Sequence, residues 1–226
     1  MFLPRHARAV FGLGLALLGL ASLPAAEPRN LNLLKNEIRA YIESGEYDRD
    51  IAQVVADARK WLEQRIAAEE QRPAGERHRL AAVFDIDETL LSNLPHMRKM
   101  DFGYVPSAWS QWVDTGEAPA IAPVRDLLLF ARQKGMAIFI LTGRFEPDRS
   151  GTEKNMHAVG ISDLSGLMFK PADHGLSTEA FKTACRKKIE TDGYTIALNI
   201  GDQDSDLRGG FAEKTFKLPD PFYLIP

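Results

Sequence analysis

The stretch LAAVFDIDETLL at residues 80–91 decides the fold of this chain. The letters LAAVF are apolar and predict a buried strand, and Asp85 and Asp87 stand where that strand ends. Carboxylates at alternate positions project to the same side of an extended backbone. Asp-x-Asp alone is common in turns, but an apolar strand that runs straight into DIDETLL predicts a functional pair of carboxylates at a strand end.

Outward from this stretch, short β-branched runs alternate with amphipathic helical stretches. We expect strands at 80–84, 137–141, 167–169, 195–200 and 215–218, and helices at 124–134, 152–159, 178–191 and 204–213. This alternation predicts an α/β fold, a Rossmann-like and mostly parallel sheet with helices on both faces. Ligands bind such sheets at the carboxyl ends of the strands, so residues that follow strands are the candidates for a site.

Further candidates for the site are Thr142, Gly143 and a lysine. Thr142 and Gly143 close the second strand, where a hydroxyl can donate a hydrogen bond to a ligand oxygen and a glycine lets the backbone approach closely. Lys182, on the helix before the fourth strand, offers a cation that can offset negative charge on a ligand. Lys170, at the end of the third strand, is a rival for that role.

The fourth strand ends in NIGDQDSD at residues 199–206. Asp202 and Asp206 would converge with Asp85 and Asp87 if the first and fourth strands are neighbours. Mg²⁺ prefers such an oxygen-rich setting. These four aspartates are therefore the predicted metal site.

The same segment allows a calcium-loop interpretation. Asp202, Asp204, Asp206 and Glu213 have the spacing of EF-hand ligands, but the position that needs glycine for the sharp turn is Leu207. An apolar strand also precedes the segment, where an EF-hand needs a helix. The magnesium interpretation is favoured.

Five segments together resemble the haloacid-dehalogenase-like superfamily, and within it the secreted acid phosphatases. That group includes bacterial class B and class C acid phosphatases, plant acid phosphatases and vegetative storage proteins. The segments are DIDETLLSNLP at 85–95, ILTGR at 140–144, FKTACRKKI at 181–189, GYTIALNIGDQDSDL at 193–207 and KTFKLPDP at 214–221. The resemblance extends from about residue 80 to 218 and implies a Mg²⁺-dependent phosphomonoesterase.

The resemblance also implies a role for each motif residue. Asp85 would be the nucleophile that forms an aspartyl-phosphate, and Asp87 the general acid and base. Catalysis and phosphate binding would fall to Asp85, Asp87, Thr142, Gly143 and Lys182, with Lys182 preferred to Lys170 by the family's spacing. Mg²⁺ would be held by Asp85, the Asp87 backbone carbonyl, Asp202 and Asp206, the last of which could instead hold a metal-bound water or orient Lys182.

A storage or binding relative without catalysis is the alternative function. Such a relative would be expected to have lost at least one of Asp85, Asp87, Lys182 or Asp202, and the chain retains all four.

The predicted domain organisation has three parts. Residues 1–26 have the basic start, short apolar run and small-residue end of a signal peptide. Helices at 31–42 and 48–70, within residues 27–77, would pack on a catalytic domain at 78–226. Residues 93–123 form a small cap-like insertion whose aromatic residues either line the pocket entrance or anchor the insertion: Phe102, Tyr104, Trp109 and Trp112. His96 and His174 are better explained as surface or structural residues than as pocket residues.

Composition narrows the location and the partners. The apolar run at 10–23 is shorter than the roughly 20 residues of a membrane-spanning helix, so we expect export to the periplasm or secretion without a stable membrane anchor. The net charge is −3, and loss of Arg5 and Arg8 with the signal would make it −5. An acidic chain has no electrostatic case for nucleic-acid binding, so a small phosphomonoester is the expected partner. Cys185 is the single cysteine and cannot form a disulfide within the chain.

Overall fold

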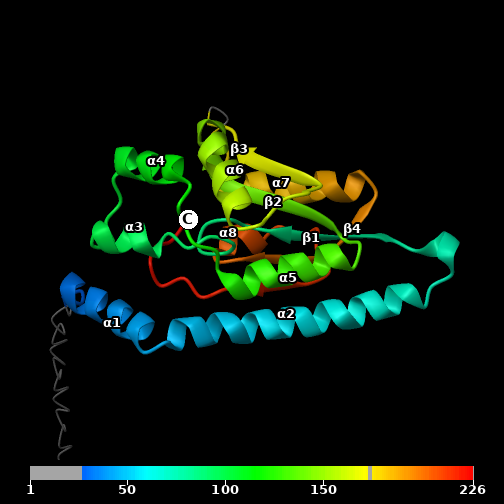
Figure 1. Cartoon of the computed structure of the whole chain (residues 1–226), viewed down its shortest axis with the longest axis horizontal. Coiled ribbons are helices and arrows are strands. Elements are labelled where there is room, and N and C mark those ends of the chain that lie inside the picture. Colours follow the sequence, from blue (N-terminus) through cyan, green and yellow to red (C-terminus); the bar gives the residue numbers. More distant parts are fainter. Residues whose placement is uncertain (1–26, 173–174, 226) are drawn as a thin grey trace, which may run out of the picture.

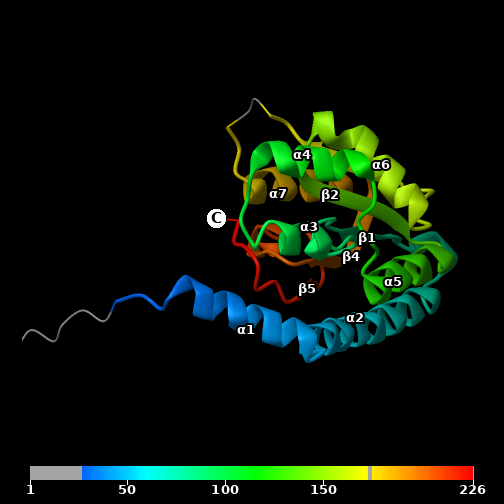
Figure 2. The ribbon, with the colours of Figure 1, turned by 60° about the vertical axis from the view of Figure 1, so that its left-hand side comes forward.

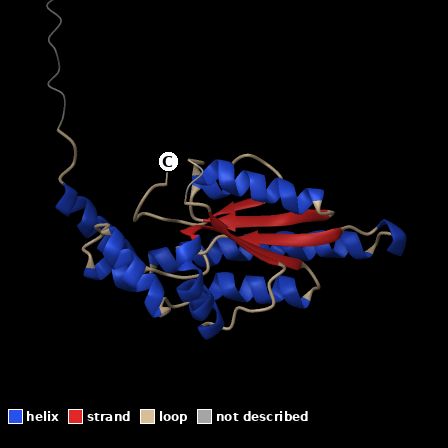
Figure 3. Cartoon of the chain, turned by 90° about the horizontal axis from the view of Figure 1, so that it is seen from above, coloured by secondary structure: helices blue, strands red, loops and turns tan. Residues whose placement is uncertain are grey.

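The fold is a parallel five-stranded sheet with helices on both faces, as the sequence predicts. The computed structural model describes residues 27–172 and 175–225, so the predicted signal peptide and His174 lie outside the described residues. The strand order is β3-β2-β1-β4-β5, and every neighbouring pair is parallel. Figure 3 shows the sheet between its helical layers.

The elements have the following bounds. The strands are β1 (Arg79–Phe84), β2 (Ala137–Phe145), β3 (Gly166–Lys170), β4 (Tyr194–Gly201) and β5 (Thr215–Lys217). The helices are α1 (Leu31–Glu43), α2 (Glu46–Glu70), α3 (Leu94–Lys99), α4 (Pro106–Thr115), α5 (Ala122–Gln133), α6 (Arg149–Ala158), α7 (Thr178–Thr191) and α8 (Asp204–Leu207).

The central strand β1 is buried on both faces, which explains its continuous apolar sequence. Ala82 and Phe84 belong to the core that α2 and α5 share with the sheet. Ala81 and Val83 point to the opposite face and pack with Ile189 of α7. In the sheet, β1 lies between β2 and β4. Its carboxyl end therefore lies at the middle of the sheet edge.

Helix α2 packs along one side of the sheet layer, and α1 has no buried residue. The buried residues of α2 recur every three or four positions, including Ile51, Val55 and Leu62, as an amphipathic helix requires. The Trp61 indole donates to the Ala197 carbonyl of β4 at 2.8 Å, which ties α2 to the sheet. Figures 1 and 2 show α2 running along the molecule and α1 continuing beyond its end. Within the described ranges, no helix combines the length and apolar content that crossing a bilayer requires.

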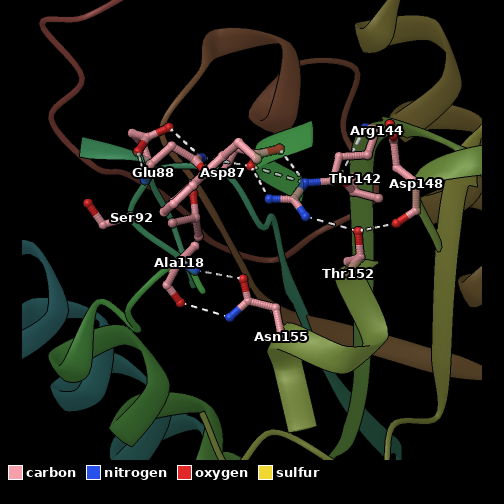
Figure 4. Close-up of polar contacts among 12 residues, drawn as sticks. Asp87, Glu88, Ser92, Ala118, Thr142, Arg144, Asp148, Thr152 and Asn155 are labelled. Carbon is pink, nitrogen blue, oxygen red and sulfur yellow. Dashed lines mark hydrogen bonds and ion pairs between the residues drawn. The ribbon is translucent and has the colours of Figure 1, made fainter. Parts of the chain in front are cut away.

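The insertion at 93–123 contains two helices, α3 and α4, at the same end of the sheet as α8 (Figure 1). Its return to the sheet is held by Asn155 of α6, whose amide accepts from the Ala118 N–H at 3.0 Å and donates to the Ala118 carbonyl at 2.8 Å (Figure 4). The insertion is therefore attached to the main body by specific hydrogen bonds as well as by its ends.

Two predicted ends lie four or more residues from the observed ones. The helix expected at 204–213 ends at Leu207, because Gly209, Gly210 and Phe211 adopt positive φ values of 86°, 79° and 61° that a right-handed helix excludes. Strand β2 runs on to Phe145, past the predicted end at residue 141. The Thr142-Gly143-Arg144 segment is thus part of β2, with a register irregularity against β3.

Glu69 at the end of α2 predicts an acid-sensitive contribution to stability. Burial alone would raise the pKa of Glu69, but hydrogen bonds from Arg65 and His78 lower it to about 2. Because the folded-state pKa is below the ordinary value of 4.5, ionised Glu69 stabilises the fold at pH values above 4.5. This contribution disappears as the pH falls towards 2. We expect Glu69→Gln to lower the free energy of unfolding at neutral pH, and the difference from wild type to shrink under acid, in urea titrations.

Glu63→Gln is the matched control. Glu63 forms an exposed pair with Arg59 on the same helix, and such pairs contribute little. Equal losses in both variants, or a Glu69 effect that does not change with pH, would contradict the assignment.

Candidate active site

The residues after β1 form a tight turn that presents Asp85 at the centre of the sheet edge. The Asp85 N–H donates to the Ile200 carbonyl of β4 at 3.1 Å, so the first residue of the motif is still held by the neighbouring strand. The Ile86 carbonyl then accepts from three following amides, and Glu88 adopts a φ of 52°. Thr89 closes the turn towards β4, because its hydroxyl donates to Asp202 at 3.2 Å.

The end of β4 brings a second set of carboxylates to the same place. Asp202 and Asp206 are 1% and 3% exposed. Gly201 lets Asp206 fold back against the strand, since an added Cβ would lie 2.4 Å from an Asp206 carboxylate oxygen. The backbone carbonyl of Asp206 accepts from Asn199 at 2.9 Å and from Arg186 at 2.6 Å. Asp206 is thereby fixed through its backbone as well as its side chain.

Lys182 of α7 joins the two sets. Its ammonium donates to Asp85 and, at 2.6 Å, to Asp206, and the whole residue is 2% exposed. Carboxylate oxygens of Asp85, Asp202 and Asp206 all lie within 4.8 Å of one another. The structure thus gathers four of the predicted site residues into one buried cluster.

This cluster has more negative charge than its own cation can balance. Burial raises the pKa of Asp85, against the opposing effect of Lys182, and burial with repulsion from Asp85 and Asp206 raises the pKa of Asp202. Burial alone would lower the pKa of Lys182, but Asp85 and Asp206 raise it above its ordinary value. Three clustered carboxylates around one ammonium form an all-oxygen donor set suited to a hard divalent cation.

The remaining predicted residues are divided between the site and its surroundings. Thr142 is fully buried in β2, and its hydroxyl accepts from the Arg144 N–H at 3.0 Å. Gly143 follows it, with no added-Cβ contact shorter than 3.7 Å. Lys170 contacts the Thr178 hydroxyl at 3.3 Å and is not among the groups that meet Asp85.

Asp87 is not one of the three clustered carboxylates, and its side chain faces Arg144 (Figure 4). The Arg144 guanidinium donates to Asp87 at 2.7 Å, and on its other side to the Thr152 hydroxyl at 2.9 Å. Asn93 donates to the same Asp87 oxygen at 2.8 Å. The two aspartates of the motif therefore occupy different electrostatic environments.

Glu88 is a buried carboxyl group, and none of the described residues pairs a cation with it. It accepts from the backbone and side chain of Asn93 at 2.6 and 3.1 Å, and from the Tyr223 hydroxyl at 3.1 Å. Burial raises the pKa of Glu88 to about 8. Glu88 thus ties the motif turn to residues 219–225, whose Asp220 also accepts from Gln203 at 2.5 Å.

Aromatic residues of the insertion gather beside Arg144. The His96 ring stacks on Trp112 with centroids 5.6 Å apart, and Trp109 lies 5.6 Å from the Arg144 guanidinium carbon. His96 is 8% exposed, whereas Tyr104 is 70% exposed. Phe102 stacks on Phe222 and anchors the insertion to the body. The insertion aromatics therefore include both an anchor and a set near the site.

The sequence patterns did not single out Arg144, Asn93, Glu88 or Gln203. All four stand inside the quoted motifs DIDETLLSNLP, ILTGR and GYTIALNIGDQDSDL, but nothing in a linear pattern shows that Arg144 returns to Asp87. The only signal in the sequence was that these polar residues stand close to the motif residues at the strand ends.

The fold and this site define an α/β protein with a buried carboxylate cluster at the carboxyl ends of its central parallel strands. The chain superposes on the class C acid phosphatase from Bacillus anthracis with a TM-score of 0.68 and 24% sequence identity, covering 86% of this chain and 87% of that one. At this identity the likeness concerns the fold.

The family follows from the sequence match. The family model of the HAD superfamily, subfamily IIIB (acid phosphatase), matches residues 22–226, and the chain belongs to that family. The chain is 37% identical over 148 residues to acid phosphatase 1 of Solanum lycopersicum, and 32% identical over 148 residues to vegetative storage protein 1 of Arabidopsis thaliana. These matches cover 63% and 64% of this chain, but 58% and 55% of those proteins, so the chain spans little more than half the length of these relatives.

The close approach of Asp206 to Gly201 leaves no room for a side chain at position 201. We expect Gly201→Ala to destabilise the fold by about 1 to 3 kcal/mol, because the added methyl group must displace Asp206. Urea denaturation measures the change. Gly75→Ala is the control, since an added Cβ there meets nothing within 4 Å. A Gly201→Ala protein as stable as wild type would contradict the close approach.

Proposed function

We propose that this protein is a phosphomonoesterase of the acid-phosphatase type that acts through an aspartyl-phosphate on Asp85 with Mg²⁺ as cofactor. The observation that carries the proposal is the buried cluster of Asp85, Lys182, Asp206 and Asp202 at the carboxyl ends of adjacent strands β1 and β4. Membership of the subfamily IIIB acid phosphatases supports the same chemistry.

Asp85 has the position and surroundings of a nucleophile. It is the carboxylate nearest to a buried ammonium, and it stands at the middle of the sheet edge, where parallel sheets bind ligands. Because burial raises the pKa of Asp85, Lys182 is needed to keep the group ionised for attack on phosphorus. Thr142, the Gly143 backbone and Lys182 would then bind the phosphoryl oxygens.

Asp87 supplies the proton transfers of both steps. It gives its proton to the leaving-group oxygen while the bond from that oxygen to phosphorus breaks and the bond from Asp85 forms. As a carboxylate it then accepts a proton from the water that hydrolyses the aspartyl-phosphate. The ion pair with Arg144 holds Asp87 towards the side of the site where the insertion lies.

The donor set fits a divalent cation held by Asp85, Asp202 and Asp206, together with the Asp87 backbone carbonyl. When bound, Mg²⁺ would neutralise the repulsion between Asp85 and an incoming phosphate dianion. Asp206 additionally orients Lys182, which donates to it at 2.6 Å.

We propose a small phosphomonoester as the substrate. The insertion at 93–123 stands beside Asp87 and Arg144, and its exposed Tyr104 and adjacent Trp109 offer aromatic faces to a leaving group. A phosphate panel that varies the leaving group would rank nucleotide and aryl esters.

A non-catalytic storage or binding role is the second candidate, because vegetative storage proteins are among the matched relatives. The clustered geometry of Asp85 and Lys182 favours catalysis over this role. Hydrolysis of p-nitrophenyl phosphate with Mg²⁺ and with EDTA separates them: phosphate release that requires metal supports the enzyme, and no release from folded protein supports storage or binding.

We also propose that the protein is exported after removal of residues 1–26, leaving helices at 27–77 on a catalytic domain at 78–226. The basic start and short apolar run of the sequence support export. N-terminal sequencing of the protein purified from the exported fraction tests the cleavage point. A chain that still begins at Met1 would reject it.

Asp85→Asn is the direct test of the nucleophile. We expect phosphate release to fall to background, because the amide cannot attack phosphorus, while far-ultraviolet circular dichroism stays that of wild type. Asp57→Asn, on the exposed side of α2, is the control and should retain activity. Appreciable turnover by the Asp85 variant would move the nucleophile elsewhere.

We expect the substitution Asp202→Asn to raise the stability of the metal-free protein and to weaken its stabilisation by Mg²⁺. In the absence of metal we expect the variant to be more stable than wild type, because it removes one of three repelling buried carboxylates. Wild type should gain about 2.7 kcal/mol at a hundredfold excess of Mg²⁺ over its dissociation constant, and the variant much less. Thermal denaturation with EDTA and with Mg²⁺ measures both, and an unchanged metal response would contradict the site.

A further inference from the structure

Asn93 connects the insertion to the proposed acid and base, Asp87. The Trp112 indole N–H of α4 donates to the Asn93 carbonyl oxygen at 2.8 Å. The Asn93 amide nitrogen donates to Asp87 at 2.8 Å and to Glu88 at 3.1 Å. Asn93 itself is 1% exposed, so this chain of hydrogen bonds is shielded from water.

The partners allow only one orientation of the Asn93 amide. An indole N–H can only donate, and an ionised carboxylate can only accept. A flipped amide would place its nitrogen against the Trp112 donor and its oxygen against Asp87 Oδ1, which already accepts from Arg144. Trp112 therefore sets which end of Asn93 faces Asp87.

The two oxygens of Asp87 are consequently unequal. Oδ1 accepts from Asn93 at 2.8 Å and from Arg144 at 2.7 Å, whereas Oδ2 has a single, longer contact with Arg144 at 3.2 Å. The carboxylate side chain remains 18% exposed. Oδ2 is thus the oxygen left available for a proton transfer.

We propose that Asn93 is a positioning residue for Asp87: held by Trp112, it binds Oδ1 and turns Oδ2 towards the leaving group. This inference rests on the proposed phosphomonoesterase activity and on Asp87 as its acid. When the proton on Oδ2 passes to the leaving oxygen, negative charge develops on Asp87, and Asn93 and Arg144 meet it with donors already in place.

Loss of Asn93 should therefore affect esters that need a proton on the leaving group. An alkoxide is a poor leaving group and depends on the acid, whereas p-nitrophenolate leaves without it. We expect Asn93→Ala to lower kcat/KM for an alkyl phosphate about tenfold more than for p-nitrophenyl phosphate, a fraction of the 10²–10⁴-fold contribution typical of a general acid. The parameter kcat/KM is used because it reports the step that expels the leaving group.

Trp112→Phe tests the other end of the chain. It keeps an aromatic ring against His96 but removes the N–H that orients Asn93. We expect the same preference for p-nitrophenyl phosphate with a smaller magnitude. This variant also serves if Asn93→Ala does not fold, because it leaves the Asn93 contacts to Glu88 in place.

Asn155→Ala is the matched control. Asn155 is equally buried, and its amide makes two hydrogen bonds to Ala118 and none to Asp87. It should lower thermal stability without changing the ratio of kcat/KM between the two esters. Asp87→Asn is the reference for complete loss of the acid and should give the largest change in that ratio.

The outcomes separate this inference from the proposed function. Wild type that hydrolyses neither ester would reject the phosphatase itself. Active wild type with an unchanged ratio in folded Asn93→Ala and Trp112→Phe would reject only the positioning role, as would an equal ratio change in Asn155→Ala.

Discussion

The buried ion cluster around Lys182 is the constraint on which the rest of the structure depends. One ammonium meets two carboxylates from two strand ends, with a third close by, where water cannot screen them. Buried charges are tolerated only when they are paired and hydrogen-bonded. The charged groups come together because β1 and β4 are neighbours in the sheet and because α7 packs against β4.

The surrounding residues hold three carboxyl groups around a single ammonium group. Gly201 allows Asp206 to fold back, Arg186 and Asn199 fix its carbonyl, and Thr89 and Gln203 bind Asp202. Because these contacts fix the carboxylates before any ligand arrives, repulsion cannot be relieved by moving them apart. A site held in this way is prepared for a cation and for a negatively charged substrate.

The motif aspartates acquire different characters although they stand two residues apart. Asp85 enters the cluster with Lys182, whereas Asp87 pairs with Arg144 and Asn93. Neighbouring carboxylates in distinct environments are how one site supplies both a nucleophile and an acid. The separation depends on β2, which carries Arg144, and on the insertion, which carries Trp112 against Asn93. Distant parts of the chain thereby define the environment of one side chain.

The sequence by itself determined the class of fold and most of the chemical groups. Alternating apolar runs predicted the parallel sheet, and strand-end motifs named Asp85, Asp87, Thr142, Asp202 and Asp206, because apolar periodicity and turn residues are local properties. Lys182, on a helix, was named through the spacing of the family that the sequence resembles. It misjudged the helix after β4, where Gly209 and Gly210 take positive φ. Only the tertiary structure decided that Lys182 rather than Lys170 meets Asp85, that Arg144 pairs with Asp87, and that Asn93 joins the insertion to the site. Those contacts join residues brought together by strand order and helix packing, and no local pattern in the chain records such distances.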